Sequence, residues 1–69
     1  MPKGTVKWFS VQRGYGFIVP DDGGADTFVH ISTVERAGLG LLNEGQRLEY
    51  DVNRDKGRRV SAVNLRSAE

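Results

Sequence analysis

Apolar and polar residues alternate along much of the chain, and this period of two indicates β-strands with one buried and one exposed face. Between residues 15 and 19, Tyr15, Phe17 and Val19 fall on one side, and Gly16 and Ile18 fall on the other. Segments rich in turn-forming residues separate such stretches. The pattern predicts five strands, at about residues 3–10, 15–19, 26–31, 46–53 and 58–66.

The last two predicted strands show the same alternation. The expected buried face of residues 46–53 is apolar and consists of Leu48, Tyr50 and Val52. In residues 58–66, one face is expected to carry Val60, Ala62 and Asn64, and the other Ser61, Val63 and Leu65. Turns are expected at residues 20–24 and 54–57, where proline, aspartate and glycine gather.

The middle of the chain breaks the alternation. Ser32 is followed three residues later by Glu35, which is the spacing of a helix-capping box, so we predict one helical turn that starts at Ser32. Gly38 and Gly40 should end that turn. The loop that follows, with its leucines at 39, 41 and 42, is expected to lie partly over one end of the fold.

Five short strands with one helical turn between the third and fourth predict an all-β fold, a five-stranded antiparallel Greek-key barrel of the OB type. The 69 residues should form a single domain. We expect a monomer, because a closed barrel leaves few strand edges free to pair.

The amino-acid composition indicates the cellular compartment in which the protein is expected. The chain has no cysteine, so packing alone must stabilise it, and a reducing compartment is expected. No apolar run has the length of a membrane span, and the first residues lack the apolar core of a secretory signal. These features favour a cytoplasmic protein without a membrane partner.

Charge is unevenly distributed, although the net charge is only +1. Residues 1–20 contain three basic residues and no acidic one, whereas residues 21–55 contain eight acidic residues against three arginines. Basic residues again prevail in residues 56–69. This asymmetry would give the barrel one basic side suited to a phosphate backbone, but scatter over a solvated surface is an equal alternative.

Aromatic residues gather on one face of two neighbouring strands. Tyr15 and Phe17 share a face of the second strand, and Phe28 and His30 share a face of the third. If these strands pair antiparallel, the four rings form one patch, which Lys7 and Arg13 would flank. Exposed rings edged by cations suit unpaired nucleobases, which stack on aromatic side chains while cations hold the backbone.

Simpler interpretations compete with this one. Trp8, Phe17 and Phe28 could fill the core, where large aromatic residues usually lie. His30 could be a buried, hydrogen-bonded histidine, and as the only histidine in a chain without cysteine it does not predict a zinc site. Gly16 could allow close approach between strands, or mark a turn or bulge, and Gly14 could adopt a positive φ at the strand entry.

Three segments resemble the signature of the bacterial cold-shock proteins in order and spacing. They are Lys3-Gly4-Thr5-Val6-Lys7-Trp8-Phe9, then Arg13-Gly14-Tyr15-Gly16-Phe17-Ile18, and then Phe28-Val29-His30-Ile31-Ser32. The second is similar to the RNP1 motif and the third to the RNP2 motif. The resemblance covers essentially the whole chain.

This resemblance implies a ligand face lined by Lys7, Trp8, Phe9, Arg13, Tyr15, Phe17, Phe28 and His30. Strict alternation would put Trp8 opposite its two neighbours, so we predict a bulge or a strong local twist near Trp8. Arg58 and Arg59 would either reach the phosphates or remain solvated at the strand end. Ile31 and Leu39 stand where the family often has aromatic residues, which implies fewer stacking positions and weaker binding.

The sequence thus predicts a binding protein for single-stranded RNA and DNA, which acts as an RNA chaperone without ATP. A preference for pyrimidine-rich stretches is implied by the resemblance. The alternative is an OB-type module that docks a protein or the ribosome through the same surface. An enzyme fits worst, because no nucleophile-base or carboxylate pair stands out, and Asp21 and Asp22 are explained by local hydrogen bonds in a turn. No cofactor or metal is expected.

Overall fold

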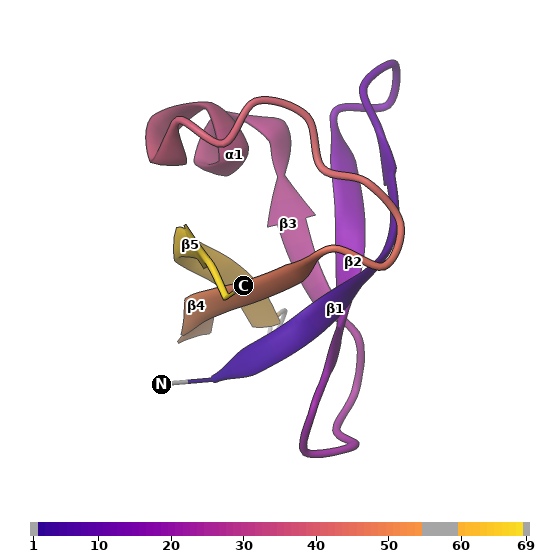
Figure 1. Ribbon diagram of the computed structural model, residues 1–69, viewed down its shortest axis with the longest axis vertical. Coiled ribbons are helices and arrows are strands. Elements are labelled where there is room, and N and C mark those ends of the chain that lie inside the picture. Colours follow the sequence, from indigo (N-terminus) through magenta and orange to yellow (C-terminus); the bar gives the residue numbers. More distant parts are fainter. Residues whose placement is uncertain (1, 55–59, 69) are drawn as a thin grey trace.

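Residues 2–54 and 60–68 are described by a computed structural model, and these parts of the chain contain five strands and one helix (Figure 1). The elements are β1 (Lys3–Ser10), β2 (Tyr15–Pro20), β3 (Thr27–His30), α1 (Ile31–Ala37), β4 (Arg47–Arg54) and β5 (Val60–Ser67). The predicted all-β fold with a short helix is confirmed. The expected start of the last strand, at Arg58 and Arg59, lies outside the described residues.

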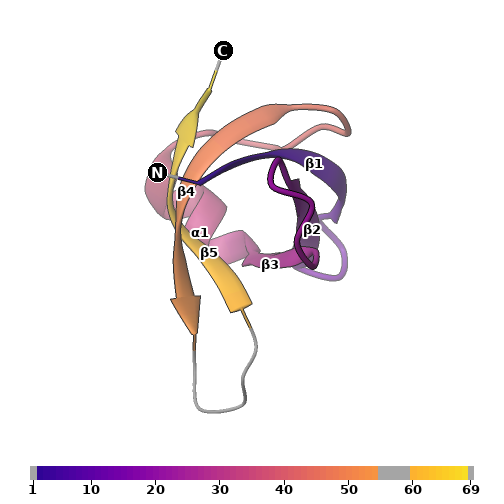
Figure 2. The same cartoon turned by 90° about the horizontal axis from the view of Figure 1, so that it is seen from below.

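The strands close into a barrel in the order β1-β2-β3-β5-β4 (Figure 2). Four of the five neighbouring pairs run antiparallel. β3 and β5 run parallel and meet at Phe28 and Ser61, because the chain passes through α1 and β4 before it returns beside β3. This arrangement is the Greek-key barrel of the OB type that the sequence predicts.

The barrel interior is filled by the inward faces of the strands, with α1 and the loop after it at one end. The buried apolar side chains are Val6, Ile18, Val29, Val34, Leu42, Leu48, Tyr50, Ala62 and Leu65. Full burial of one such aliphatic side chain contributes about 1.5–3 kcal/mol. Ile18 and Val29 alternate with the aromatic residues of β2 and β3, so the rings of these two strands point away from this core.

The N-cap of the helix lies two residues earlier than its sequence signature suggests. The N-cap is His30, which has extended dihedral angles, and its ring nitrogen Nδ1 accepts a hydrogen bond from the Ser32 N–H at 3.1 Å. The expected capping box from Ser32 to Glu35 is therefore wrong, since the chain turns into the helix directly at the end of β3. Gly38 ends the helix in the left-handed conformation, as expected, and its N–H donates to the Glu35 carbonyl.

A bulge between β4 and β5 changes the expected faces of both strands. Glu49 pairs with Arg66 and Asp51 with Val63, so β5 carries one extra residue opposite Tyr50. Asn64 adopts a positive φ of 53° there. Because the alternation restarts after it, Leu65 lies in the core with Ala62, not on the opposite face.

β4 also departs from its expected pattern near its end. Leu48 and Tyr50 are buried as predicted, but the side chain of Val52 is exposed. Val52 lies beyond the bulge, where it pairs with Ala62 of β5. The expectation that three residues of this strand reach the core therefore holds for two of them.

Candidate nucleic-acid interface

A bulge in β1 brings Trp8 onto the outer surface of the barrel. Val6 pairs with Ile18 and Trp8 pairs with the next residue back on β2, Phe17, so Lys7 is an extra residue in β1. The predicted irregularity near Trp8 is therefore confirmed. Its consequence is that Trp8 lies beside Phe17 on the outside, whereas Val6 faces the core on the other side of the bulge.

The register of β2 and β3 places four more rings next to each other. Tyr15 pairs with His30, and Phe17 pairs with Phe28. Directly opposed residues of antiparallel strands point to the same face, so these side chains form two adjacent cross-strand pairs. The sequence predicted this pairing and the resulting patch.

The distances between ring centroids show that the patch is continuous. Trp8 lies 5.4 Å from Phe17 and 5.6 Å from Tyr15. Phe28 lies 5.5 Å from Tyr15 in a stacked arrangement and 5.9 Å from Phe17, edge to face. His30 extends the row, 6.3 Å from Phe28. We call Trp8, Tyr15, Phe17, Phe28 and His30 the ring cluster.

The ring cluster lies outside the core. His30 is exposed, and the other four rings are half-buried, partly by one another. Directly beneath them, Val6, Ile18 and Val29 are at most 2% exposed. The alternatives in which Trp8, Phe17 and Phe28 fill the barrel, or in which His30 is buried, are therefore excluded. An accessible row of aromatic rings on the outside of a barrel is a candidate surface for flat ligands.

Two glycines fix the backbone around these rings. A Cβ added to Gly16 would come within 2.8 Å of the Phe9 Cα, so only glycine allows β1 and β2 to approach this closely. Gly14 has a φ of +80°, and its carbonyl accepts a hydrogen bond from the Ile31 N–H at 2.8 Å. The sequence left close approach and turn formation open, and Gly16 provides the first and Gly14 the second.

Phe9 is separated from the ring cluster. It pairs with Gly16 of β2, packs against the core and is partly buried. Once the bulge has turned Trp8 outward, normal alternation turns the next side chain inward. The expectation that Phe9 also contacts the ligand stays a prediction.

Two of the three predicted cations, Lys7 and Arg13, have different surroundings. Lys7 Nζ forms an ion pair with Asp26 Oδ2 at 3.0 Å. Arg13 is exposed in the loop after β1, and the structure gives its guanidinium no ion pair with any residue in ranges 2–54 and 60–68. Arg58, the third predicted cation, lies outside the described residues.

His30 belongs to the ring cluster and also holds the start of α1. Its Nδ1 accepts from the Ser32 N–H and lies 2.9 Å from Ser32 Oγ. This geometry requires the neutral tautomer with hydrogen on Nε2, which leaves Nε2 as a donor for a ligand. Over the described part of the chain, no three histidine, aspartate or glutamate side chains gather into a metal site.

An ion pair outside the ring cluster was missed by sequence reasoning. Arg47 donates to both carboxylate oxygens of Asp21 at 2.6 Å and to Thr5 Oγ1 at 3.0 Å. These hydrogen bonds from Arg47 lower the pKa of Asp21. Asp22 follows the local expectation, since its Oδ1 accepts from the Gly24 N–H. No sequence signal links Asp21 with Arg47, because 26 residues separate them.

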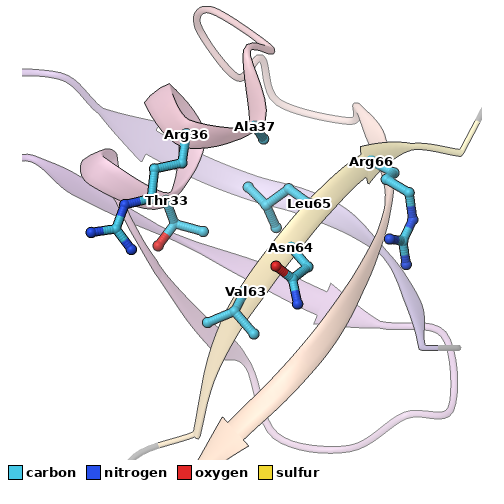
Figure 3. Close-up of a pocket in the computed structure, with 7 residues that line it drawn as sticks. All are labelled: Thr33, Arg36, Ala37, Val63, Asn64, Leu65 and Arg66. Atoms are coloured by element: carbon cyan, nitrogen blue, oxygen red, sulfur yellow. The ribbon is translucent and has the colours of Figure 1, made fainter.

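A groove elsewhere on the barrel runs between α1 and β5 (Figure 3). Its lining residues are Thr33, Arg36, Ala37, Val63, Asn64, Leu65 and Arg66. The side chains of Arg36 and Arg66 lie on opposite sides of it, and Arg66 forms an ion pair with Glu49 at 3.5 Å. None of the described residues that line the groove is aromatic, so they offer no ring on which a base could stack.

Comparison with known proteins identifies relatives that match along nearly the whole chain. Residues 2–68 match the family described as 'Cold-shock' DNA-binding domain. Cold shock protein CspA of Rhizobium meliloti (strain 1021) is 58% identical over 69 residues, which cover 99% of this chain and all of the relative. Cold shock-like protein CspE of Escherichia coli (strain K12) is 50% identical and covers 91% of this chain and 90% of the relative.

A plant protein contains a similar segment within a longer chain. Glycine-rich protein 2 of Nicotiana sylvestris is 51% identical over 63 residues, which cover 91% of this chain but 29% of the plant protein. The same fold therefore also occurs as one part of a larger molecule. In the part of the present chain that the structure describes, no helix is long and apolar enough to cross a membrane.

Proposed function

The chain belongs to the family of proteins with a 'Cold-shock' DNA-binding domain, and we propose that it binds unpaired RNA and DNA and acts as an RNA chaperone without ATP. The observation that carries this proposal is the ring cluster, five neighbouring rings on the outside of a closed barrel. A nucleic-acid binder of this family needs a surface that accepts bases, and this row of rings has the required chemistry.

Base stacking explains a preference for single strands. A base can lie against Phe17 or Phe28 only after it has left its own stack, and each base stacked on a ring gains about 1–3 kcal/mol. In a duplex both faces of every base are already covered. Binding of the open form then shifts a hairpin equilibrium by mass action, and no nucleotide hydrolysis is needed.

Cations next to the rings would hold the phosphates between the stacked bases. Lys7 lies on β1 next to Trp8, and Arg13 lies in the loop that joins β1 to β2. Contacts to phosphates do not depend on sequence, so weak base specificity is expected. The preference for pyrimidine-rich stretches and the weaker binding through Ile31 and Leu39 stay predictions. We further propose a cytoplasmic monomer with no catalytic activity.

Trp8 provides the test, because it is the only tryptophan of the chain. Its fluorescence is titrated with a short oligothymidine strand and with a duplex of equal length, at about 50 and 200 mM salt. Quenching by the single strand, with clearly weaker binding of the duplex and lower affinity at high salt, is expected. Absence of quenching, or equal affinity for the duplex, would reject the proposal.

The same titration separates the alternative of a protein or ribosome module. Binding through phosphates releases counterions and weakens steeply as salt rises. An apolar dock for a protein would respond little to salt and would not select single strands. Exchange of the oligothymidine strand for the same sequence in RNA measures any preference between the two nucleic acids.

A further inference from the structure

We propose that Ser32 is a positioning residue for the ring cluster, which holds the ring of His30 with Nδ1 turned toward α1 and the Nε2 hydrogen available to a single strand. This role rests on the proposed function, because it concerns how the same surface is prepared for its ligand. Ser32 lies in the first turn of α1, and the sequence indicated only a helix-capping role for it.

Two groups of Ser32 converge on one nitrogen of His30. The Ser32 N–H donates to Nδ1 at 3.1 Å, and Ser32 Oγ lies 2.9 Å from the same nitrogen. The backbone N–H can only donate, so Nδ1 accepts and carries no hydrogen, and the hydroxyl then also approaches it as a donor. A ring turned over about its Cβ–Cγ bond would present carbon to both groups. The contacts with Ser32 therefore favour one orientation of the ring.

Other contacts of His30 fix its backbone but leave the ring orientation open. His30 pairs with Tyr15 of β2, and the N–H of the next residue, Ile31, donates to the Gly14 carbonyl at 2.8 Å. The side chain of His30 is exposed to solvent. Its ring lies 6.3 Å from Phe28 with the planes tilted by 44°, so the two rings are not stacked. Ser32 supplies the direction that these contacts do not.

Orientation before binding affects affinity more than it affects folding. Both hydrogen bonds to Nδ1 are exposed to water, so their net contribution to stability is small. A side chain that already has its bound orientation loses little rotamer freedom when a ligand arrives. The Nε2 hydrogen can then donate to an oxygen of a phosphate or of a base carbonyl. Loss of the Ser32 hydroxyl should therefore weaken binding of a protein that still folds.

Ser32→Ala tests the inference, because it removes the hydroxyl and keeps the backbone N–H. We expect about fourfold weaker binding of the oligothymidine strand in the Trp8 fluorescence titration. Ser32→Thr keeps a hydroxyl at this position and should bind within about 1.5-fold of the wild type. Thr33→Ala is the matched control, because it removes a hydroxyl from the next residue of α1, which lines the groove beside β5. Its affinity should also stay within about 1.5-fold. Thermal unfolding verifies that all three variants fold.

The ring orientation itself is measured by NMR in the free protein, where His30 is the only histidine. Three-bond couplings across the Cα–Cβ bond report whether the side chain keeps one rotamer. We expect one rotamer in the wild type and in Ser32→Thr, and averaging in Ser32→Ala. The positioning role is overturned if the wild type averages as well, or if Ser32→Ala averages no more than the wild type. A hydrogen found on Nδ1 of the wild type at about pH 8, where an ordinary imidazole is neutral, would also overturn it.

A double-mutant cycle with His30→Ala separates positioning from direct contact. In the His30→Ala background, Ser32→Ala should leave the affinity for the oligothymidine strand nearly unchanged. If the loss persists without the ring, Ser32 contacts the ligand itself and the positioning role is overturned. Failure of the wild type to bind the strand would reject the proposed function, and the couplings of the free protein would then decide by themselves whether Ser32 orients His30.

Discussion

At the scale of single residues, the position of an aromatic residue relative to the bulge in β1 determines whether its side chain faces outward or toward the core. Trp8 and Phe9 are neighbours in the sequence, yet Trp8 contacts Tyr15 and Phe17 on the outside and Phe9 packs against the core. Phe9 lies on β1 and Phe17 lies on β2, and their side chains point to opposite faces of the sheet. Replacement of their rings should therefore affect different properties.

Phe17→Leu should weaken binding of single strands about tenfold, because it removes a ring on which a base can stack and keeps an apolar side chain. The affinity is measured by the Trp8 fluorescence titration. Phe9→Leu is the matched control and should change the affinity by less than about twofold, while it lowers the free energy of unfolding by up to about 1.5 kcal/mol. Equal losses of affinity in both variants would contradict the separation of Phe9 from the ring cluster.

His30 combines two roles that substitution can separate. Its ring belongs to the ring cluster, and its Nδ1 caps α1. His30→Asn keeps an N-cap acceptor but loses the ring, so it should fold with nearly wild-type stability and bind more weakly. His30→Ala loses both functions, and its unfolding free energy should fall by about 1 kcal/mol. Thermal unfolding and the titration together measure the two effects, and equal stability of both variants would contradict the capping role.

At the scale of elements, regular alternation was predictable and its interruptions were not. The sequence correctly placed Tyr15 and Phe17 outward and Ile18 inward, because β2 is uninterrupted and the two faces differ in chemistry. It failed at Leu65, because one residue with left-handed backbone, Asn64, shifts the faces of β5. Asparagine tolerates the left-handed conformation, but an asparagine within a strand pattern is not enough to predict that conformation.

The helix start shows a second limit. Ser32 and Glu35 have the spacing of a capping box, but the N-cap is set by where β3 ends, and the side chain of His30 satisfies the Ser32 N–H. Both His30 and Ser32 could cap the start of α1, and the place where β3 ends selects His30. The bulge at Trp8 was predictable only from a conflict between alternation and the residues that the family resemblance places on the ligand face.

At the scale of the whole molecule, contacts between distant segments supplement a small core. The chain has no cysteine, and several charged side chains from different strands and loops form ion pairs. Arg47 on β4 joins Asp21 after β2 with Thr5 on β1. Sequence reasoning could not find such pairs, because they depend on the closed order of the strands.

The Asp21–Arg47 pair predicts a dependence of stability on pH. Hydrogen bonds from Arg47 lower the pKa of Asp21 below the ordinary value of 3.8, so the folded state binds this proton less readily than the unfolded chain. The contribution is complete well above pH 3.8 and is lost as the pH falls through the lowered pKa of the folded state. Both side chains are exposed to solvent, so the effect should be small and should decrease with added salt.

Comparison of thermal unfolding in the wild type and in Asp21→Asn checks this prediction. The wild type should unfold at the higher temperature near neutral pH, and the difference should shrink as the pH falls below the ordinary aspartate pKa of 3.8. Asp22→Asn removes the same charge but keeps the oxygen that accepts from the Gly24 N–H, so it should unfold nearly like the wild type. A difference between wild type and Asp21→Asn that is independent of pH would exclude the ion pair as its cause.

The central claim is that bases bind on the ring cluster on the outside of the barrel, and chemical-shift mapping by NMR tests it most directly. The ¹⁵N-labelled protein is titrated with a short oligothymidine strand, and amide and indole signals are followed. We predict the largest shifts at the Trp8 indole and at amides of β1, β2 and β3 near Phe17 and Phe28, with little change along α1 and β5. Shifts concentrated in the groove around Arg36 and Val63, with the ring cluster unaffected, would contradict the account.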